Sequence, residues 1–284
     1  MTACPTFEDL HTTPWALPNG VQLHTVREGQ GAPLIFIHGA MGDWRSWAAQ
    51  WSAFTPHFDC ISYSRRYSFP NQNPMPSPDH GALHEAQDLQ LLMDAMGLER
   101  AVLVGSSYGA FTALALAVQS PERVDAVVAV EPPMMKYAQR TPEGQSVAET
   151  FRREVIEPAN AAFRAGEDER AAQIMTGGIN GGQSAVNTGT AMARRLQNLR
   201  AMKMLALSSD EFPWLSPAQL SGLPMPVLLL AGRQTQPVHR VIFENVCAAM
   251  PQAQHGWVDG AGHGVTREQP DIFNRLALAF LASV

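Results

Sequence analysis

The stretch Ala101-Val-Leu-Val-Gly-Ser-Ser-Tyr-Gly-Ala110 contains the pattern G-x-S-x-G. Four apolar residues precede the pattern, as in a buried strand, and an amphipathic pattern over residues 111–119 follows it, as in a helix. Ser107 alone has glycine both two positions before and two positions after it, where side chains would collide with the neighbouring strand and helix. The pattern therefore predicts a sharp turn that exposes the Ser107 hydroxyl at a helix N-terminus, where the helix dipole favours negative charge. The alternative is a glycine-serine turn without chemistry.

Short apolar runs alternate with amphipathic stretches along most of the chain. The runs are continuous, so both faces of each strand should be buried, as in the centre of a parallel sheet. We expect strands at Leu34–Ile37, Cys60–Ile61, Ala101–Val104, Val124–Val130 and Val227–Leu230, with a leading antiparallel strand at Val21–Val26. We expect helices at Trp44–Phe54, Asp79–Met96, Phe111–Gln119, Val238–Met250 and Pro270–Leu281. This order predicts an α/β fold with a mostly parallel central sheet flanked by helices.

The alternation of strands and helices stops at Pro132-Pro133 and resumes near Pro224-Met-Pro226. We therefore expect a core formed by residues 1–131 and 223–284, with residues 132–222 as an inserted helical lid, or cap. The insertion contains six of the thirteen methionines, and Met-rich surfaces often repack around ligands. A helical subdomain without a role in binding is the alternative. Within the insertion, Gly177–Gly182 predicts a turn.

The composition excludes several classes of protein. The chain has 284 residues, of which 45% are hydrophobic and 16% charged, and this is typical of a soluble globular protein. The formal net charge is −6 and no basic run occurs, so a nucleic-acid partner is not expected. Cys4, Cys60 and Cys247 are widely separated, which favours free thiols. With no signal-like N-terminus and no membrane-length apolar run, we expect a cytoplasmic protein without a membrane partner.

With the serine motif as its centre, the sequence resembles the α/β-hydrolase superfamily, and this resemblance extends over nearly the whole chain. Leu34-Ile-Phe-Ile-His-Gly-Ala-Met-Gly42 is similar to the family's third strand and the oxyanion turn after it. The resemblance implies the α/β-hydrolase fold, with the backbone N–H groups of Ala40 and Tyr108 as the oxyanion hole and His38 supporting the turn. The family's late histidine matches His263 in Asp259-Gly-Ala-Gly-His263-Gly264, which implies a general base. The alternative for His263 is a solvent-exposed loop histidine.

The acid of the expected triad departs from the commonest family pattern. The usual G-x-x-D turn reads Gly232-Arg-Gln-Thr235 here, without a carboxylate. Glu131 follows the run Val124–Val130, and the ends of such strands are where open α/β sheets place their sites. This layout resembles the esterase and lactonase branch, including zearalenone-type lactonases, that uses a glutamate after strand six. The resemblance implies that Glu131 orients His263, so activity should depend on Glu131 and survive loss of Thr235; the alternative is a structural glutamate near the lid hinge.

Two arginines after the fourth strand have two possible roles. Arg65 and Arg66 could clamp a substrate carboxylate, or they could support their loop through Asp43 or backbone carbonyls. A metal site is not expected, because His80 and His84 have no third ligand and the other histidines, including His239, belong to no recognisable cluster.

These residues and the resemblance predict a cofactor-independent serine hydrolase. It would cleave a carboxylic ester or lactone of an apolar or aromatic small molecule through an acyl-enzyme, with Ser107, His263 and Glu131 as catalytic residues. The expected substrate contacts are Met41, Met134, Met135 and Trp214. A C–C bond hydrolase of ring-cleavage diketones and a non-catalytic ligand-binding member of the fold are the alternatives. The oligomeric state is left open.

Overall fold

A single sheet of eight strands runs through the computed structural model, which describes residues 7, 10–75, 79–181 and 189–284. The strands are β1 (Thr13–Ala16), β2 (Gln22–Glu28), β3 (Pro33–Ile37), β4 (Asp59–Tyr63), β5 (Ala101–Ser106), β6 (Val124–Val130), β7 (Val227–Gly232) and β8 (Gln254–Val258). Their order is β1-β2-β4-β3-β5-β6-β7-β8. Strand β2 is antiparallel to β1 and β4, and all other neighbours are parallel. This sheet confirms the predicted α/β fold.

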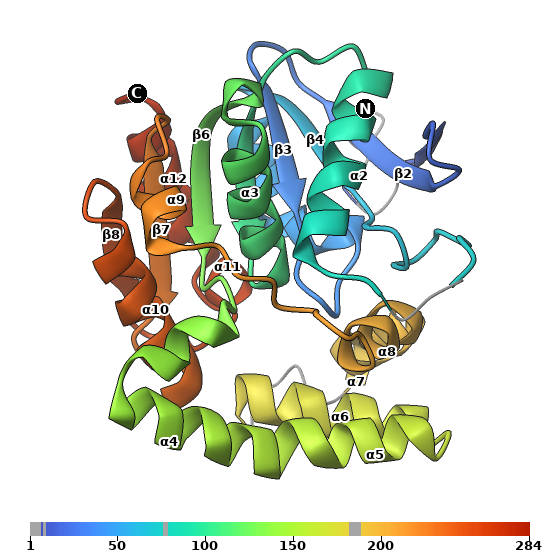
Figure 1. The fold of residues 1–284 in the computed structure, drawn as a ribbon. Coiled ribbons are helices and arrows are strands. Elements are labelled where there is room, and N and C mark those ends of the chain that lie inside the picture. The colour runs from blue at the N-terminus through green and yellow to red at the C-terminus, as the bar shows by residue number, and fades with distance from the viewer. Residues whose placement is uncertain (1–6, 8–9, 76–78, 182–188) are drawn as a thin grey trace.

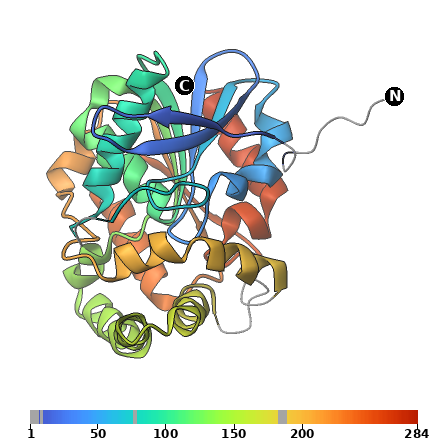
Figure 2. The same cartoon turned by 90° about the vertical axis from the view of Figure 1, so that its right-hand side faces the viewer.

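Helices cover both faces of the sheet (Figures 1 and 2). One face carries α2 (Ala82–Ala95), α3 (Tyr108–Gln119), α9 (Pro217–Ser221) and α10 (Pro237–Ala249), and the other carries α1 (Ala48–Phe54), α11 (Val265–Glu268) and α12 (Pro270–Leu281). Side chains of a strand alternate between these faces. In β3, Ile35 and Ile37 join the core under α2 and α3, whereas Leu34 and Phe36 join the aromatic core under α1 and α12. Burial on both faces explains the continuous apolar runs.

The structure differs from the sequence-based expectation at the edges of the sheet and at one helix. Strands β1 and β8 are edge strands, which need no continuous apolar run. Strand β1 contains Pro14, and β8 reads Gln-His-Gly-Trp-Val and is buried only at Val258, so neither shows a clear strand pattern. The helix expected over Trp44–Phe54 begins as a 3-10 turn, η2 (Trp44–Trp47), which the Asp43 side chain caps before α1 starts.

The described residues between β6 and α9 contain helices and loops without a strand. The helices are η4 (Met135–Arg140), α4 (Pro142–Phe151), the π-helical turn η5 (Arg152–Ile156), α5 (Glu157–Arg164), α6 (Asp168–Asn180), α7 (Gly189–Gln197) and α8 (Leu199–Ala206). Figure 1 shows α4 to α8 lying beyond the carboxyl ends of the central strands. Phe163 and Met202 pack with Met41, which belongs to the loop after β3. These helices therefore cover the edge where parallel sheets place their sites.

One expectation within this helical segment is wrong. The turn predicted at Gly177–Gly182 does not begin at Gly177, because residues 177–180 continue α6. Only Gly181, with φ of 82°, adopts left-handed backbone at the end of the helix, and Gly182 lies outside the described residues.

The thiols and the helix lengths complete the description of the fold. Cys60 and Cys247 are free, as expected, and Cys4 lies outside the described residues. Among the helices of the described ranges, none has both the length and the apolar character that crossing a lipid bilayer requires.

Candidate active site

Ser107 occupies a strained turn between β5 and α3. Its backbone has φ of 53° and ψ of −122°, and its N–H donates to the carbonyl of Val130 at 2.7 Å. A Cβ at Gly105 would lie 2.4 Å from the Gly109 carbonyl oxygen, and one at Gly109 would lie 2.0 Å from the Ile37 carbonyl oxygen. Glycine at both positions therefore allows β3, β5 and α3 to approach closely enough for the turn to form.

Ser107, His263 and Glu131 form one continuous hydrogen-bonded chain. The Nε2 atom of His263 lies 2.9 Å from Ser107 Oγ, and its Nδ1 atom lies 2.6 Å from Glu131 Oε2. Because an ionised carboxylate only accepts hydrogen bonds, Nδ1 carries the proton of the neutral ring and Nε2 presents its lone pair to the serine hydroxyl. The structure thus brings together the three residues that the sequence analysis singled out from distant positions.

The carboxylate of Glu131 is buried and fully engaged. Its Oε1 atom accepts from the Gly232 N–H at 2.8 Å, and its Oε2 atom accepts from Thr235 Oγ1 at 2.8 Å as well as from His263. The backbone at Glu131 has φ of 44°, in the left-handed region that non-glycine residues rarely adopt. The turn after β7, which lacks the usual aspartate, therefore supplies two donors that hold the glutamate from the neighbouring strand. The hydrogen bond from Thr235 to Glu131 was not predicted. Because Thr235 occupies the position of the usual acid, a contact with the triad could have been inferred from the sequence.

Two backbone N–H groups lie beside Ser107. Gly39 to Gly42 form a turn closed by a 3.2 Å hydrogen bond from the Gly42 N–H to the Gly39 carbonyl, and Ala40 is its second residue. Tyr108 is the first residue of α3. Neither Ala40 nor Tyr108 donates its backbone N–H to a carbonyl or side chain within the described ranges, and both residues line the cavity that contains Ser107. This is the arrangement that an oxyanion hole requires.

A buried network supports the turn after β3. His38 Nδ1 donates to the Gly39 carbonyl at 2.8 Å, and His38 Nε2 accepts from the Arg65 N–H at 3.0 Å. Burial and then the charge of Arg65 lower the pKa of His38 to about 3, so the ring is neutral. Arg65 also donates to the Gly39 carbonyl and to Glu85 Oε1, at 3.2 and 2.8 Å. Arg65 therefore has the supporting role that was one of its two predicted alternatives, through a hydrogen bond to a backbone carbonyl.

Arg66 is likewise a supporting residue. Its Nε and Nη2 atoms bind both carboxylate oxygens of Asp88 at 2.7 and 2.6 Å. Neither Arg65 nor Arg66 lines the cavities at Ser107. The other alternative, in which these arginines bind a substrate carboxylate, is therefore wrong for both. Asp43 instead pairs with Arg45.

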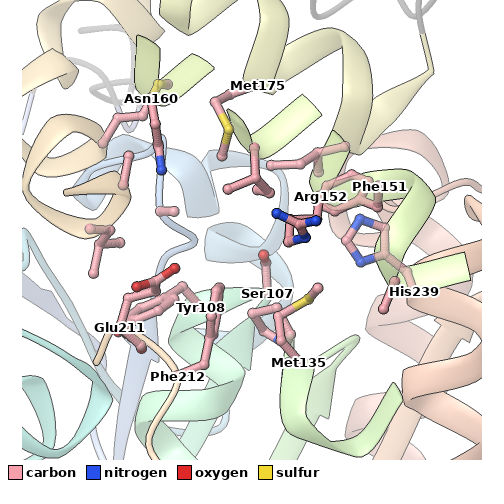
Figure 3. Close-up of a pocket in the computed structure, with 18 of the residues that line it drawn as sticks. Ser107, Tyr108, Met135, Phe151, Arg152, Asn160, Met175, Glu211, Phe212 and His239 are labelled. Atoms are coloured by element: carbon pink, nitrogen blue, oxygen red, sulfur yellow. Dashed lines mark hydrogen bonds between the residues drawn. The ribbon is translucent and has the colours of Figure 1, made fainter. Parts of the chain in front are cut away.

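A mainly apolar cavity of about 520 Å³ opens at Ser107. Figure 3 shows Phe151 and His239 on one side of the serine, Phe212 and Glu211 on the other, and Met175 beyond them. Most of its lining comes from the helices between β6 and β7, including Met135, Phe151, Ile156, Met175, Ile179 and Met202.

Two of the four predicted substrate contacts line this cavity, and two do not. Met41 and Met135 line it. Met134 is instead buried in the main core. Trp214 is 45% exposed and stacks on Tyr137 with ring centroids 4.9 Å apart. The prediction that Met134 and Trp214 contact substrate is wrong, because Met134 packs in the core and Trp214 packs on Tyr137 at the surface.

Several polar side chains lie among the apolar residues that line the cavity, namely Gln139, Gln145, Glu149, Arg152, Asn160 and Glu211. Burial raises the pKa of Glu211, whose backbone carbonyl accepts from the Tyr108 hydroxyl at 2.6 Å. Asn160 has a buried Oδ1 atom without a donor among the described residues, and Figure 3 shows its side chain directed toward the cavity. Arg152, also at the cavity, is held by Glu149. A bound molecule would therefore meet mainly apolar surface with polar groups placed to form hydrogen bonds.

His239 is a further residue at the site. It belongs to the first turn of α10 and stacks on His263, with ring centroids 4.2 Å apart and planes 25° from parallel. Neither ring nitrogen has a hydrogen-bond partner among the described residues. Burial and then the neighbouring His263 lower the pKa of His239 well below its usual range, so the ring is neutral. The sequence did not predict that His239 lies at the site. Its position four residues after Thr235 was the one feature that pointed there.

Glu131, His239 and His263 place ligand atoms within 4.8 Å of one another. Imidazole lone pairs lie in the ring plane, so two nearly parallel rings do not direct them at one ion. Glu131 and both nitrogens of His263 are already engaged in the chain that ends at Ser107. The geometry favours an acid–base array over a metal centre.

Comparison with known proteins agrees with this architecture. The family model described as alpha/beta hydrolase fold matches residues 32–266. The chain belongs to this hydrolase family. It is 25% identical over 272 residues to 2-hydroxy-6-oxo-6-phenylhexa-2,4-dienoate hydrolase of Burkholderia cepacia, covering 92% of each chain.

Two further similarities span most of the chain. A protein of Caulobacter segnis, provisionally named carbamate hydrolase RutD, is 24% identical over 258 residues, which cover 87% of this chain and 90% of that protein. The crystal structure of carboxylesterase CesB from Bacillus subtilis superposes with a TM-score of 0.72 at 21% identity, covering 97% of this chain and 93% of the other. This structural similarity establishes the fold.

Proposed function

We propose that this hydrolase is a serine hydrolase that cleaves a carboxylic ester or lactone of an apolar or aromatic small molecule through an acyl-enzyme. The observation that supports the proposal is the hydrogen-bonded chain from Ser107 Oγ through His263 to Glu131, with contacts of 2.9 and 2.6 Å, at the wall of an apolar cavity. In this proposal Ser107 is the nucleophile, His263 the general base and Glu131 the acid.

The first half of the reaction forms the acyl-enzyme. Ser107 Oγ attacks the carbonyl carbon while its proton moves to Nε2 of His263. Glu131 accepts the hydrogen bond from Nδ1 and stabilises the imidazolium that forms, and the N–H groups of Ala40 and Tyr108 donate to the tetrahedral oxyanion. His263 then gives its proton to the leaving alkoxide oxygen as the bond between the carbonyl carbon and that oxygen breaks.

The second half of the reaction releases the acid. A water molecule gives a proton to Nε2 of His263 and attacks the acyl carbon, and the same N–H groups hold the oxyanion. Collapse of this intermediate breaks the ester bond to Ser107, whose oxygen regains a proton from His263. Every proton passes through His263, so its ring must be neutral at the start of each half.

The substrate class follows from the lining of the cavity. Its methionines and aromatic side chains, among them Met41, Met135 and Phe151, favour an apolar or aromatic group over a sugar. Residues 132–222 would form the lid that supplies this specificity, on a core of residues 1–131 and 223–284. Flexible methionines suit a lid that repacks around its ligand.

A second candidate reaction shares the same residues. The similarity to a protein named as the hydrolase of a 2-hydroxy-6-oxo-dienoate, across 92% of both chains, favours hydrolysis of a C–C bond in a diketone of that type. Substrate trials with such diketones distinguish this reaction from ester cleavage.

Fluorophosphonate labelling and p-nitrophenyl butyrate hydrolysis test the proposed mechanism. We expect Ser107→Ala to abolish labelling and to lower kcat by about 10⁴-fold or more, and Glu131→Gln to lower kcat by about 10⁴-fold. Ser221→Ala is the control, because this exposed serine of α9 lies outside both cavities and should keep both signals. A folded wild-type protein that is neither labelled nor active on esters or diketones would support the non-catalytic ligand-binding alternative and overturn the proposal.

A further inference from the structure

A second cavity, of about 490 Å³, reaches Ser107 from another direction. It lies between the loop after β3, helix α7 and the segment that follows His263. The two cavities share Ser107, His263 and Ala40, together with Met41 and Ile179. The proposed nucleophile, base and oxyanion donor therefore stand at the junction of two chambers, which can receive the two sides of one scissile bond.

The second chamber has a different chemical character from the apolar one. Four arginines and one carboxylate line it, namely Arg45, Arg194, Arg195, Arg267 and Asp43. Asp43 is bound on both oxygens by Arg45 and also accepts from Asn198, so it is not available to the other arginines. Among the described residues that line this chamber, Asp43 is the only carboxylate.

The positive charge of Arg195 has no carboxylate partner among the described residues. It belongs to α7, and its buried Nε atom has no acceptor within the described ranges. No carboxylate of those ranges pairs with it, and Arg267 from α11 lies near enough to repel it. Among the described residues, Arg267 pairs with Glu268 alone, at 3.0 Å.

The surroundings of the Arg195 side chain disfavour its positive charge. Burial and then the positive charge of Arg267 lower the pKa of the Arg195 guanidinium to about 10. Burial of part of its side chain also lowers the pKa of Arg267, which remains 44% exposed. Both side chains still carry a positive charge at neutral pH. An anion in the chamber would relieve the repulsion between Arg195 and Arg267.

We propose that the second chamber is an anion subsite, in which Arg195 and Arg267 bind a carboxylate carried by the substrate. A planar guanidinium matches a carboxylate with two parallel hydrogen bonds. This inference rests on the proposed serine hydrolase function and narrows its substrate class. The substrate is an ester or lactone with an apolar group on one side of the scissile carbonyl and a carboxylate on the other.

Paired esters test this specificity. One pair carries the carboxylate on the acyl side, mono-p-nitrophenyl glutarate against p-nitrophenyl pentanoate. The other pair carries it on the alcohol side, p-carboxyphenyl butyrate against p-tolyl butyrate. We expect the wild-type protein to prefer the charged ester in one pair. In Arg195→Met and in Arg267→Met, the ratio of kcat/KM for the charged ester to that for its neutral partner should fall about tenfold or more.

The controls separate charge from folding. Arg170→Met removes an arginine of α6 that pairs with Glu167 outside both cavities, and it should leave the ratio unchanged. Arg195→Lys keeps the charge without the planar fork and should recover part of the preference. An unchanged ratio in both methionine variants, with cooperative thermal unfolding retained, would overturn the anion subsite.

A direct binding measurement distinguishes failure of the anion subsite from failure of the proposed esterase function. In a Ser107→Ala background, which cannot turn over esters, calorimetry should show that phenylbutyrate binds more tightly than phenylbutanol, and that Arg195→Met removes the difference. Charge-dependent binding without ester turnover in the wild type would support the subsite and contradict the esterase. Ester turnover through Ser107, with equal binding of the two probes, would support the esterase and contradict the subsite.

Discussion

Glu131 is held by three hydrogen bonds: two from the turn that ends β7, given by the Gly232 N–H and the Thr235 hydroxyl, and one from Nδ1 of His263. Thr235 stands where the common family pattern places an aspartate. At this position a hydroxyl donates to the carboxylate that arrives from β6, so the turn after β7 orients the acid without supplying it. A carboxylate with these donors keeps one orientation toward the imidazole.

Thr235→Val removes the hydroxyl and nearly preserves the side-chain shape. Because the lost bond joins a hydroxyl to a buried charge, we expect kcat for p-nitrophenyl butyrate to fall about tenfold. Activity should survive loss of Thr235, as the sequence predicts, but at a reduced rate. Thr150→Val, on the exposed face of α4, is the control. Equal kcat values for Thr235→Val and the wild type would show that Gly232 and His263 alone hold Glu131.

His239 supports His263 through its ring face. His239→Phe keeps an aromatic ring against the imidazole, whereas His239→Ala leaves a gap beside it. We expect kcat to fall about 2- to 12-fold in the alanine variant, which is the range of an aromatic pair, and to change little in the phenylalanine variant.

The pH profile distinguishes packing from titration of His239. Its pKa is lowered by burial, so the ring stays neutral in the working range and the phenylalanine variant should keep the wild-type profile of kcat/KM. His255→Ala, at an exposed position, is the control. A profile displaced in His239→Phe would show instead that this ring exchanges protons during catalysis.

At the scale of elements, the turn at Ser107 depends on how closely β3, β5 and α3 approach. Gly109→Ala places a Cβ 2.0 Å from the Ile37 carbonyl oxygen, and backbone must move to accommodate it. We expect a loss of about 1–3 kcal/mol in the free energy of unfolding, together with a loss of activity. Urea titration and the ester assay measure the two effects.

Gly177→Ala is the matched control for that substitution. Gly177 lies inside α6, and a Cβ there meets nothing within 4 Å. Alanine should therefore stabilise the helix by up to about 1 kcal/mol. Similar unfolding free energies for the two variants would contradict the steric account of the turn.

At the scale of the whole molecule, buried charges connect α2 to the turn after β3. Glu85 accepts from Arg65 and from His80, each at 2.8 Å. Burial alone would raise the pKa of Glu85, but the charge of Arg65 and the hydrogen bond from His80 outweigh it and lower the pKa to about 2. A lowered folded-state pKa stabilises the protein above the unfolded-state pKa, and that stability is lost as the pH falls through the folded-state value.

Glu85→Gln tests this linkage by urea unfolding at several pH values. Near pH 7 the variant should be less stable by about 3 kcal/mol, because it leaves the buried Arg65 without its counterion. The gap to the wild type should narrow as the pH falls from about 4.5 toward about 2, since the wild-type carboxylate is then protonated. Glu149→Gln, at an exposed ion pair, should show no such gap. A gap that is constant with pH would show that Glu85 is not ionised in the folded protein.

Much of the fold was predictable from local patterns. Strand β6 and helix α12 agree with the prediction to the residue, because their apolar runs and flanking prolines are strong local signals. Strands β1 and β8 could not be predicted from apolar runs, since an edge strand is defined by the neighbour it pairs with rather than by its own composition.

The sequence by itself determined the family, the turn that presents Ser107, and the choice of Glu131 and His263 as the residues that should meet it. These depend on glycines, strand ends and missing carboxylates, all of which are visible within a few neighbouring residues. Only the tertiary structure decided that Thr235 and His239 hold this array and that Trp214 faces outward. It also showed that Arg195 and Arg267, from separate helices, line one chamber beside Ser107. The physical reason is that a turn is set by local sterics, whereas a cavity is formed by segments whose relative placement depends on the packing of the entire core.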